Sequence, residues 1–245
     1  MDFVTLSYYI WFLPIVYVCT FLIGNKQRRR QILILLASSY VFFWLASGWH
    51  VLLLLISTLV DWNAAKKINS SNDSVVRKRW LQAALIVNLG ILGIFKYLDF
   101  LIQTWNWSSL QLTGAPEIDT LGLLLPIGIS FYTFQTISYT IDVYRNKSEP
   151  YDDFLSFACY ASFFPQLVAG PIVRSDHFKK EIESSLTPSA IRFRIGLTLI
   201  IYGLAKKLII ADNVALHVNS IFDDSSGLNN IGLVWWGALA FGIQI

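Results

Sequence analysis

Repeated apolar runs of about membrane-spanning length constrain this chain more than any other feature. The runs cover residues 3–24, 32–48, 51–65, 80–102, 121–143 and 190–211, with polar segments between them. A helix needs about 20 apolar residues to cross the hydrocarbon core of a bilayer. Charged residues make up only 14% of the 245 residues, whereas a soluble domain has about a quarter. The sequence therefore predicts an all-α polytopic membrane protein with about six complete transmembrane helices.

The positions of the basic residues predict the orientation of these helices. Four cations follow the first run, and five more lie in or near the polar segment 69–79. We expect this segment to be a cytoplasmic loop. The nine cations are Lys26, Arg28, Arg29, Arg30, Lys66, Lys67, Arg77, Lys78 and Arg79. Residues 103–120 contain no Lys or Arg and are expected to form an exterior loop. Because cytoplasmic loops are rich in Lys and Arg, the amino terminus is predicted to lie outside. The first run follows Asp2 without a basic region, so it is expected to be a retained span.

Polar residues interrupt the fifth run. Gln135, Ser138 and Asp142 recur at spacings of three and four, so on a helix over 121–143 they share one face. Polar side chains at membrane depth face a bundle interior and are candidates for function. A kinked packing helix whose polar groups are satisfied by neighbours explains the same pattern equally well.

Residues 151–173 cannot form an ordinary span. Asp152 and Asp153 are suited to cap the start of a helix, and Pro165 and Gln166 are expected to end it near Phe164. Such a helix measures roughly 18 Å, against a hydrocarbon core of about 30 Å. A basic segment then begins at Arg174. The sequence predicts a re-entrant or interfacial helix with both ends on the cytoplasmic side.

Other charged residues lie near the ends of the runs. Asp61 is expected to reach headgroup water, and Lys96 and Asp99, one turn apart, are expected to pair and to extend toward the surface. Lys206 and Lys207 are adjacent and cannot point in the same direction on a helix, so at least one is expected to face the bundle or a polar cavity. Residues 212–230 are predicted to form a second exterior loop.

The last apolar run, residues 231–245, spans about 22 Å as a helix, which is too short to cross comfortably. We expect it to be a truncated last span of a single transmembrane domain that covers residues 1–245.

Motifs of soluble enzymes do not occur in the sequence. It lacks HExxH, GxxxxGK[ST] and GxSxG, and Cys19 and Cys159 fall in apolar runs without metal-type spacing. His50, His177 and His217 are scattered, and solvated or interfacial positions are expected for them. No metal, bound cofactor or nucleic-acid partner is predicted.

Four blocks of sequence resemble a known family. PIGISFYTFQTISYTIDVYR (126–145) and FFPQLVAGPIVR (163–174) are similar to signatures of the membrane-bound O-acyltransferases, and GLAKKLIIADN (203–213) and FGIQI (241–245) fit their alginate O-acetyltransferase-like branch. The resemblance implies transfer of an acyl group, here acetyl, to an exported polysaccharide such as alginate. It further implies a cytoplasmic thioester donor, acetyl-CoA or an acyl-carrier protein, as co-substrate. A location in the bacterial inner membrane and a periplasmic acetyltransferase partner would follow.

The sequence departs from this family in its catalytic region. The family's histidine motifs follow the FGIQI block and are absent here, and none of the three histidines matches them. We therefore expect an N-terminal portion that is inactive alone and contains no catalytic residue. The candidates for contact with the donor or for lining a tunnel are Gln135, Asp142, Gln166, Arg174, Lys206 and Lys207.

Two other functions fit the residues without the resemblance. A transporter would use the polar face of the fifth run as its pathway, but the internal repeat common in transporters is not visible. A non-catalytic scaffold of a cell-envelope complex is the remaining alternative.

Overall fold

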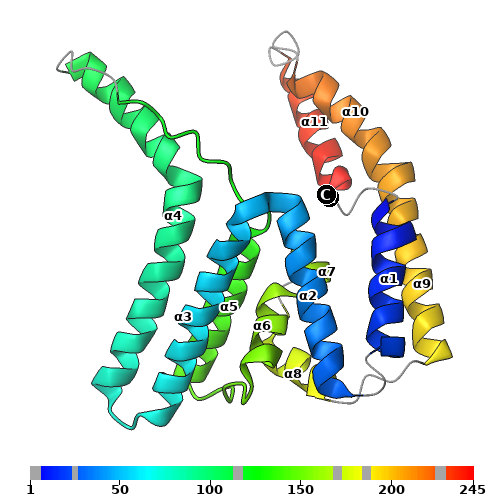
Figure 1. Cartoon of the computed structure of the whole chain (residues 1–245). Helices are drawn as coiled ribbons and strands as arrows, with labels where there is room; N and C mark the ends of the chain where they lie inside the picture. Colours follow the sequence, from blue (N-terminus) through cyan, green and yellow to red (C-terminus); the bar gives the residue numbers. More distant parts are fainter. Residues whose placement is uncertain (1–6, 24–26, 113–117, 168–172, 184–188, 224–229) are drawn as a thin grey trace. The chain divides into compact units, whose positions relative to one another are not determined.

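The structure, a computed structural model, describes residues 7–23, 27–112, 118–167, 173–183, 189–223 and 230–245. Its regular elements in these ranges are all helices (Figure 1), which confirms the all-α prediction. Contacts divide the chain into two compact units, Met1–Thr187 and Pro188–Ile245.

The first unit is a helical assembly built around the helices of the second to fifth runs. In chain order its elements are η1 (Tyr8–Phe12), α1 (Leu13–Val18), η2 (Cys19–Ile23), α2 (Arg28–Ser47), η3 (Gly48–His50), α3 (Val51–Ser70), α4 (Ser74–Leu112), α5 (Ile129–Tyr144), α6 (Phe154–Ser162), α7 (Phe164–Leu167) and α8 (Ser175–Glu183). The single turn η3 reverses the chain between α2 and α3, and α3 packs against both α4 and α5 (Figure 1).

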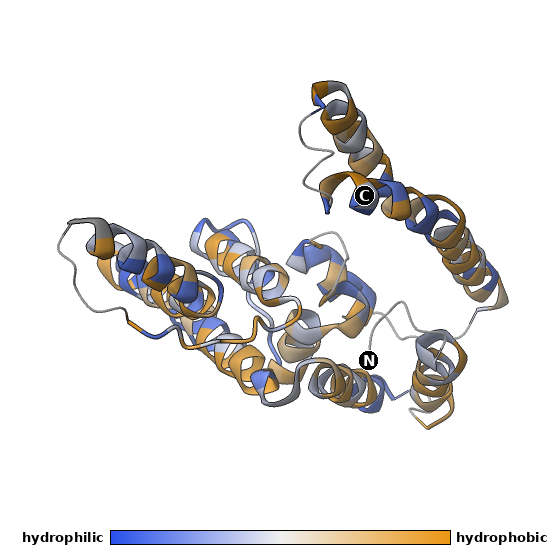
Figure 2. Ribbon diagram, turned by 90° about the horizontal axis from the view of Figure 1, so that it is seen from above, coloured by the Kyte–Doolittle hydropathy of each residue, from blue (hydrophilic) through white to orange (hydrophobic). Residues whose placement is uncertain are grey.

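Among the described residues, two helical stretches are long and apolar enough to cross a membrane: Arg28–Ser70, which comprises α2, η3 and α3, and Ser74–Leu110. Three shorter apolar helices are Tyr8–Ile23, Phe154–Leu167 and Ile231–Gln244. Hydrophobic positions recur along the helices of both units (Figure 2), and many large apolar side chains are exposed. Exposed apolar side chains of this kind are expected on helices that face lipid. The number of six complete spans stays a prediction.

The polar segment 69–79 is mostly helical, contrary to the predicted loop. α3 continues to Ser70 and α4 begins at Ser74, so only residues 71–73 connect them. The Asp73 carboxylate accepts the N–H of Val75 at 2.8 Å and thereby caps the start of α4. The prediction failed because polar composition excludes a buried helix but not the solvated end of a long one.

α4 also continues into the predicted exterior loop. It has 39 residues, about 58 Å at 1.5 Å per residue, and ends only at Leu112. The predicted pairing of Lys96 with Asp99 is wrong. Asp99 instead accepts the backbone N–H groups of Leu121 and Leu123, at 2.9 and 3.1 Å, and Lys96 lies over the Tyr97 ring. Asp99 thus ties the segment after α4 back onto that helix.

The fifth run is helical only in its second part. α5 begins at Ile129, and residues 121–127 are not helical, so the prediction of a helix over 121–143 is wrong for its first third. Side chains replace the missing helical hydrogen bonds. Besides the two bonds to Asp99, the N–H of Ile127 donates to Ser47 Oγ at 3.1 Å. Pro126 cannot donate a backbone hydrogen bond, which favours the extended segment.

The second unit consists of one long helical segment and a second helix packed against it. α9 (Ala190–Ala205), the π-helix η4 (Lys206–Ala211) and α10 (Asp212–Phe222) follow one another without a break, and α11 (Ile231–Gln244) packs against α10. The predicted exterior loop over 212–230 is therefore wrong up to Phe222. Asn230 begins α11, because its Oδ1 accepts the N–H groups of Gly232 and Leu233.

Candidate functional site

The two longest blocks of family-like sequence meet at the start of α5. Gly128 precedes α5 with a φ of 73°, a conformation that glycine adopts most readily. A Cβ atom at this position would lie 2.3 Å from the carbonyl oxygen of Leu167 in α7. Glycine is therefore required here both for the backbone angle and for the close approach of α7.

The α6–α7 segment bends at Phe163. α6 ends at Ser162, Phe163 has φ −59° and ψ 106°, and α7 is a single turn. The prediction that Pro165 ends the helix is wrong, since Pro165 lies within α7 after the bend. The N–H of Phe164 donates to Ser39 Oγ at 3.2 Å, so a side chain of α2 satisfies the backbone group freed by the bend.

α6 is a core element of the first unit, because every residue from Ser156 to Ser162 is buried. Asp153 caps it as predicted, accepting the N–H of Ser156 at 3.3 Å. The Gln135 amide Nε2 donates to the Tyr160 carbonyl oxygen at 2.8 Å and links α5 to α6. The sequence-based expectation of an interior Gln135 is met, although its role is structural in this contact.

Four buried aromatic residues surround the start of α6. The rings of Tyr139, Tyr151, Phe157 and Tyr160 lie with centroids 4.7 to 6.3 Å apart. The hydroxyls of the three tyrosines are paired. Tyr139 Oη accepts the N–H of Tyr151, while the Tyr151 and Tyr160 hydroxyls donate to the carbonyl oxygens of Ser175 and Val173.

A buried polar network joins α3, α4 and α5, and sequence reasoning missed it. Asp61 is fully buried, so the expectation that it reaches headgroup water is wrong. Thr140 Oγ1 and Asn88 Nδ2 each donate to its carboxylate at 2.9 Å, and Ser57 donates to Asn88 Oδ1. Among the described residues no cation pairs with Asp61. Lone polar residues on three separate runs gave no signal, because only tertiary packing brings them together.

Basic residues of the first unit hold the segment between α5 and α6. Arg77 Nη2 donates to the Tyr144 carbonyl oxygen at 2.6 Å and to Asn146 Oδ1 at 2.7 Å. Lys66 and Lys179 donate to the carbonyl oxygens of Asp152 and Pro150 at 3.5 and 3.3 Å. Three helices thus each supply a cation to the backbone of one short segment.

An open depression lies between the start of α2 and the start of α6. Its lining contains two cations, two acids and a buried phenol, and the full set is Arg28, Arg29, Ile32, Tyr151, Asp152, Asp153 and Ser156. Charges of both signs therefore line the depression, which lies at the end of the unit predicted to face the cytoplasm.

The structure brings together only part of the predicted site. Asp142 is half-buried and Gln166 is half-buried with its Oε1 buried, both within the first unit. Arg174 is exposed just before α8, and its carbonyl oxygen accepts the N–H groups of His177 and Phe178. His50 is buried against Trp49, whereas His177 is exposed.

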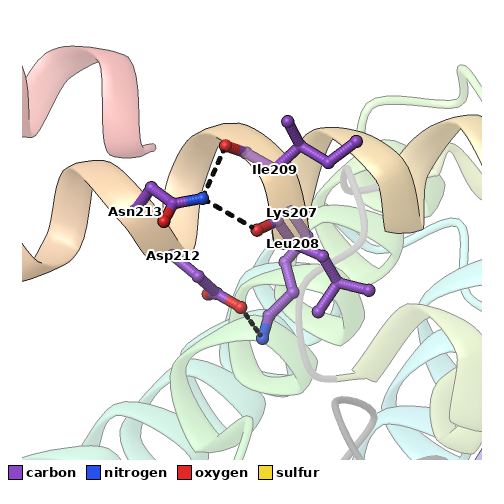
Figure 3. A network of polar contacts seen from close by, with 5 residues as sticks. All are labelled: Lys207, Leu208, Ile209, Asp212 and Asn213. Carbon is purple, nitrogen blue, oxygen red and sulfur yellow. Dashed lines mark hydrogen bonds and ion pairs between the residues drawn. The ribbon is translucent and has the colours of Figure 1, made fainter.

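Lys206 and Lys207 lie in the second unit, at the π-helix. Lys207 Nζ pairs with the Asp212 carboxylate at 2.9 Å, and Asn213 Nδ2 donates to the carbonyl oxygens of Leu208 and Ile209 (Figure 3). Lys207 and Asp212 would lie roughly 140° apart around an α-helix, and the wider turn of η4 brings them together. Lys206 is exposed and lies 4.4 Å from the centre of the Tyr202 ring.

Comparison with known proteins identifies the relatives of the chain. A protein of Pseudomonas syringae and one of Pseudomonas aeruginosa, both described as probable alginate O-acetylases, are each 34% identical over 96% of this chain. A peptidoglycan O-acetyltransferase of Helicobacter pylori is 31% identical over 84% of it. No family model and no solved structure matches.

These matches define the chain as a homologue of bacterial O-acetyltransferases. More narrowly, it falls in the alginate O-acetylase-like branch of the membrane-bound O-acyltransferases, as the sequence blocks predicted. The chain spans less than half of these relatives, 43 to 44% of their length.

Proposed function

We propose that this chain acts as the N-terminal portion of a membrane-bound O-acyltransferase that acetylates an exported polysaccharide such as alginate. The observation that carries the proposal is the identity of 34% with probable alginate O-acetylases over 96% of the chain. The contact of Gly128 with Leu167 supports it, because two family-like blocks distant in sequence pack against each other there.

In the proposed arrangement, α6 and α7 form a re-entrant segment within a bundle of about six spans. The short helix is enclosed by protein and its bend is satisfied by Ser39, as irregular backbone at membrane depth requires. The basic ends of α3 and α4 would lie in the cytoplasm of a bacterial cell, with the amino terminus outside the inner membrane.

The donor is proposed to be an acyl thioester, acetyl-CoA or an acetylated acyl-carrier protein, that approaches from the cytoplasm. The depression at Arg28 and Arg29 and the exposed guanidinium of Arg174 offer cations on that side, suited to phosphate groups. Gln135, Asp142 and Gln166 would lie along the path into the bundle, and Lys206 or Lys207 would contact a carboxylate of the acceptor. A periplasmic acetyltransferase partner would complete the transfer.

The experiment uses membranes and periplasmic extract from cells that contain the complete protein, with labelled acetyl donor and alginate, and acetyl esters on the polysaccharide as the readout. We expect transfer with the wild type, and about a tenfold loss in kcat/KM with Arg174→Ala if that cation holds the donor. Lys180→Ala, an exposed cation on α8, is the matched control and should retain activity. Absence of transfer by the wild type would refute the function, and equal activity of both variants would refute the role of Arg174.

A further inference from the structure

The phenol of Tyr132 differs from the other large buried tyrosines of the first unit. Tyr139, Tyr151 and Tyr160 each pair their hydroxyl with the backbone. Tyr132 is 0% exposed, yet its Oη has no hydrogen-bond partner among the described residues. A buried hydroxyl without a partner costs about 1–3 kcal/mol, so its presence calls for a physical reason.

The side chains around the Tyr132 ring are apolar and do not require a hydroxyl for packing. Its ring belongs to an apolar cluster made up of Phe43, Leu54, Leu92, Ile129 and Leu167. Phenylalanine would fill the same volume without the unpaired oxygen. Tyr132 also lies one turn after Gly128 on α5, close to the point where α5 meets α7. Among the described residues, Gln166 Oε1 on α7 is another buried oxygen without a partner.

We infer that the Tyr132 hydroxyl contacts a ligand, and that this ligand carries a carbonyl oxygen within an otherwise apolar group. The phenol supplies one hydrogen-bond donor to a region lined by apolar side chains, and an acyl thioester carbonyl with its methyl or alkyl group matches that combination. The inference rests on the proposed function and adds to it a contact atom for the acyl donor.

The first test compares two tyrosines on the same helix. In the full chain purified in detergent, Tyr132→Phe should leave the thermal unfolding midpoint unchanged or raise it, because an unpaired hydroxyl is removed. Tyr139→Phe is the matched control and should lower the midpoint, since its hydroxyl accepts the N–H of Tyr151 at 3.2 Å. An equal loss in Tyr132→Phe would show that the hydroxyl has a partner within the protein, and would overturn the inference.

The second test measures binding without turnover. Acetyl-CoA and an acetylated acyl-carrier protein are added separately to the complete protein, and the rise in unfolding midpoint is recorded for each. We expect at least one of them to stabilise the wild type, with about a tenfold weaker apparent affinity in Tyr132→Phe and no change in affinity in Tyr139→Phe. The donor that gives the rise identifies the source of the thioester.

The outcomes separate this inference from the proposed function. Binding that depends on Tyr132 without acetyl transfer would refute the function and retain the contact. Transfer with an unchanged KM and kcat in Tyr132→Phe would retain the function and refute the contact. Absence of stabilisation by either thioester would also refute the contact.

Discussion

Two single residues, Gly128 and Asp61, determine how helices of the first unit pack. Gly128 has a positive φ at the start of α5, and the absence of a Cβ atom there allows the Leu167 carbonyl group to approach. Asp61 is buried in α3 and accepts hydrogen bonds from Asn88 of α4 and Thr140 of α5. Substitution of either residue is therefore expected to affect contacts between helices that are distant in sequence.

Gly128→Ala should destabilise the first unit by at least about 2 kcal/mol, because an alanine would combine a positive φ with a clash against Leu167. Chemical unfolding in detergent measures the loss. Gly90→Ala is the control: Gly90 lies in the interior of α4, and a Cβ atom added there would meet nothing within 4 Å, so this change should be neutral or stabilise by up to about 1 kcal/mol. Equal effects of the two changes would contradict the packing of α7 against Gly128.

Asp61→Ala should cost about 2–4 kcal/mol, because the donors Asn88 and Thr140 would lose their buried acceptor. Asp61→Asn keeps one acceptor oxygen and should cost less. The same unfolding measurement checks both, with the exposed Asp152→Ala as control, for which we expect a change within about 0.5 kcal/mol. A similar small change in Asp61→Ala would show that the network contributes nothing to stability.

At the scale of elements, apolar periodicity located the helices but misplaced their ends. α4 and α10 both continue into segments that lack Lys and Arg and were assigned to loops. Composition fails there because a helix that leaves the bilayer becomes polar on its solvated faces while its backbone hydrogen bonds continue. The π-helix η4 was not predicted either. Lys207 and Asp212 are five residues apart, and on an α-helix this spacing predicts no contact between their side chains.

The π-helix predicts a coupling between Lys207 and Asp212 that Lys206 does not share. A double-mutant cycle with Lys207→Gln and Asp212→Asn should give a coupling energy of about 0.2–1 kcal/mol, small because both side chains are partly exposed. The same cycle with Lys206→Gln should give a coupling near zero. A coupling near zero for Lys207 as well would indicate a regular α-helix in place of η4, because an α-helix places Lys207 and Asp212 on different faces.

At the scale of the whole molecule, the helical class and the family were predictable, since both depend on composition and on contiguous blocks. The contacts among α5, α6 and α7 were only partly predictable from the sequence. Gln135 was expected to be interior and Asp153 to cap α6, but the bonds from Ser39 and Ser47 that satisfy the irregular backbone were not foreseen. Serines are common in apolar runs, and the partners of Ser47 and Ser39 lie 80 and 125 residues away in the sequence.

The proposed topology predicts where single cysteines will react with a membrane-impermeant reagent. After replacement of Cys19 and Cys159 by alanine, cysteines at Asp152 and Arg174 should both be labelled from the cytoplasmic side, because α6 and α7 are proposed to enter and leave on that side. A cysteine at Trp107, in the outer part of α4, is the control and should react from the opposite side. Labelling of positions 152 and 174 from opposite sides would replace the re-entrant segment with a complete crossing.

The hydrogen bonds from Arg77 to Tyr144 and Asn146 have a consequence for biogenesis. Arg77 is synthesised 67 residues before the carbonyl group that it binds, so the two cannot meet until the remainder of α4 and the whole of α5 have been synthesised and inserted. During that interval the guanidinium is free to hold the nascent chain on the cytoplasmic side. Arg77 would thus act first as a topogenic signal and later as the hydrogen-bond donor that links α4 to the end of α5 in the folded bundle.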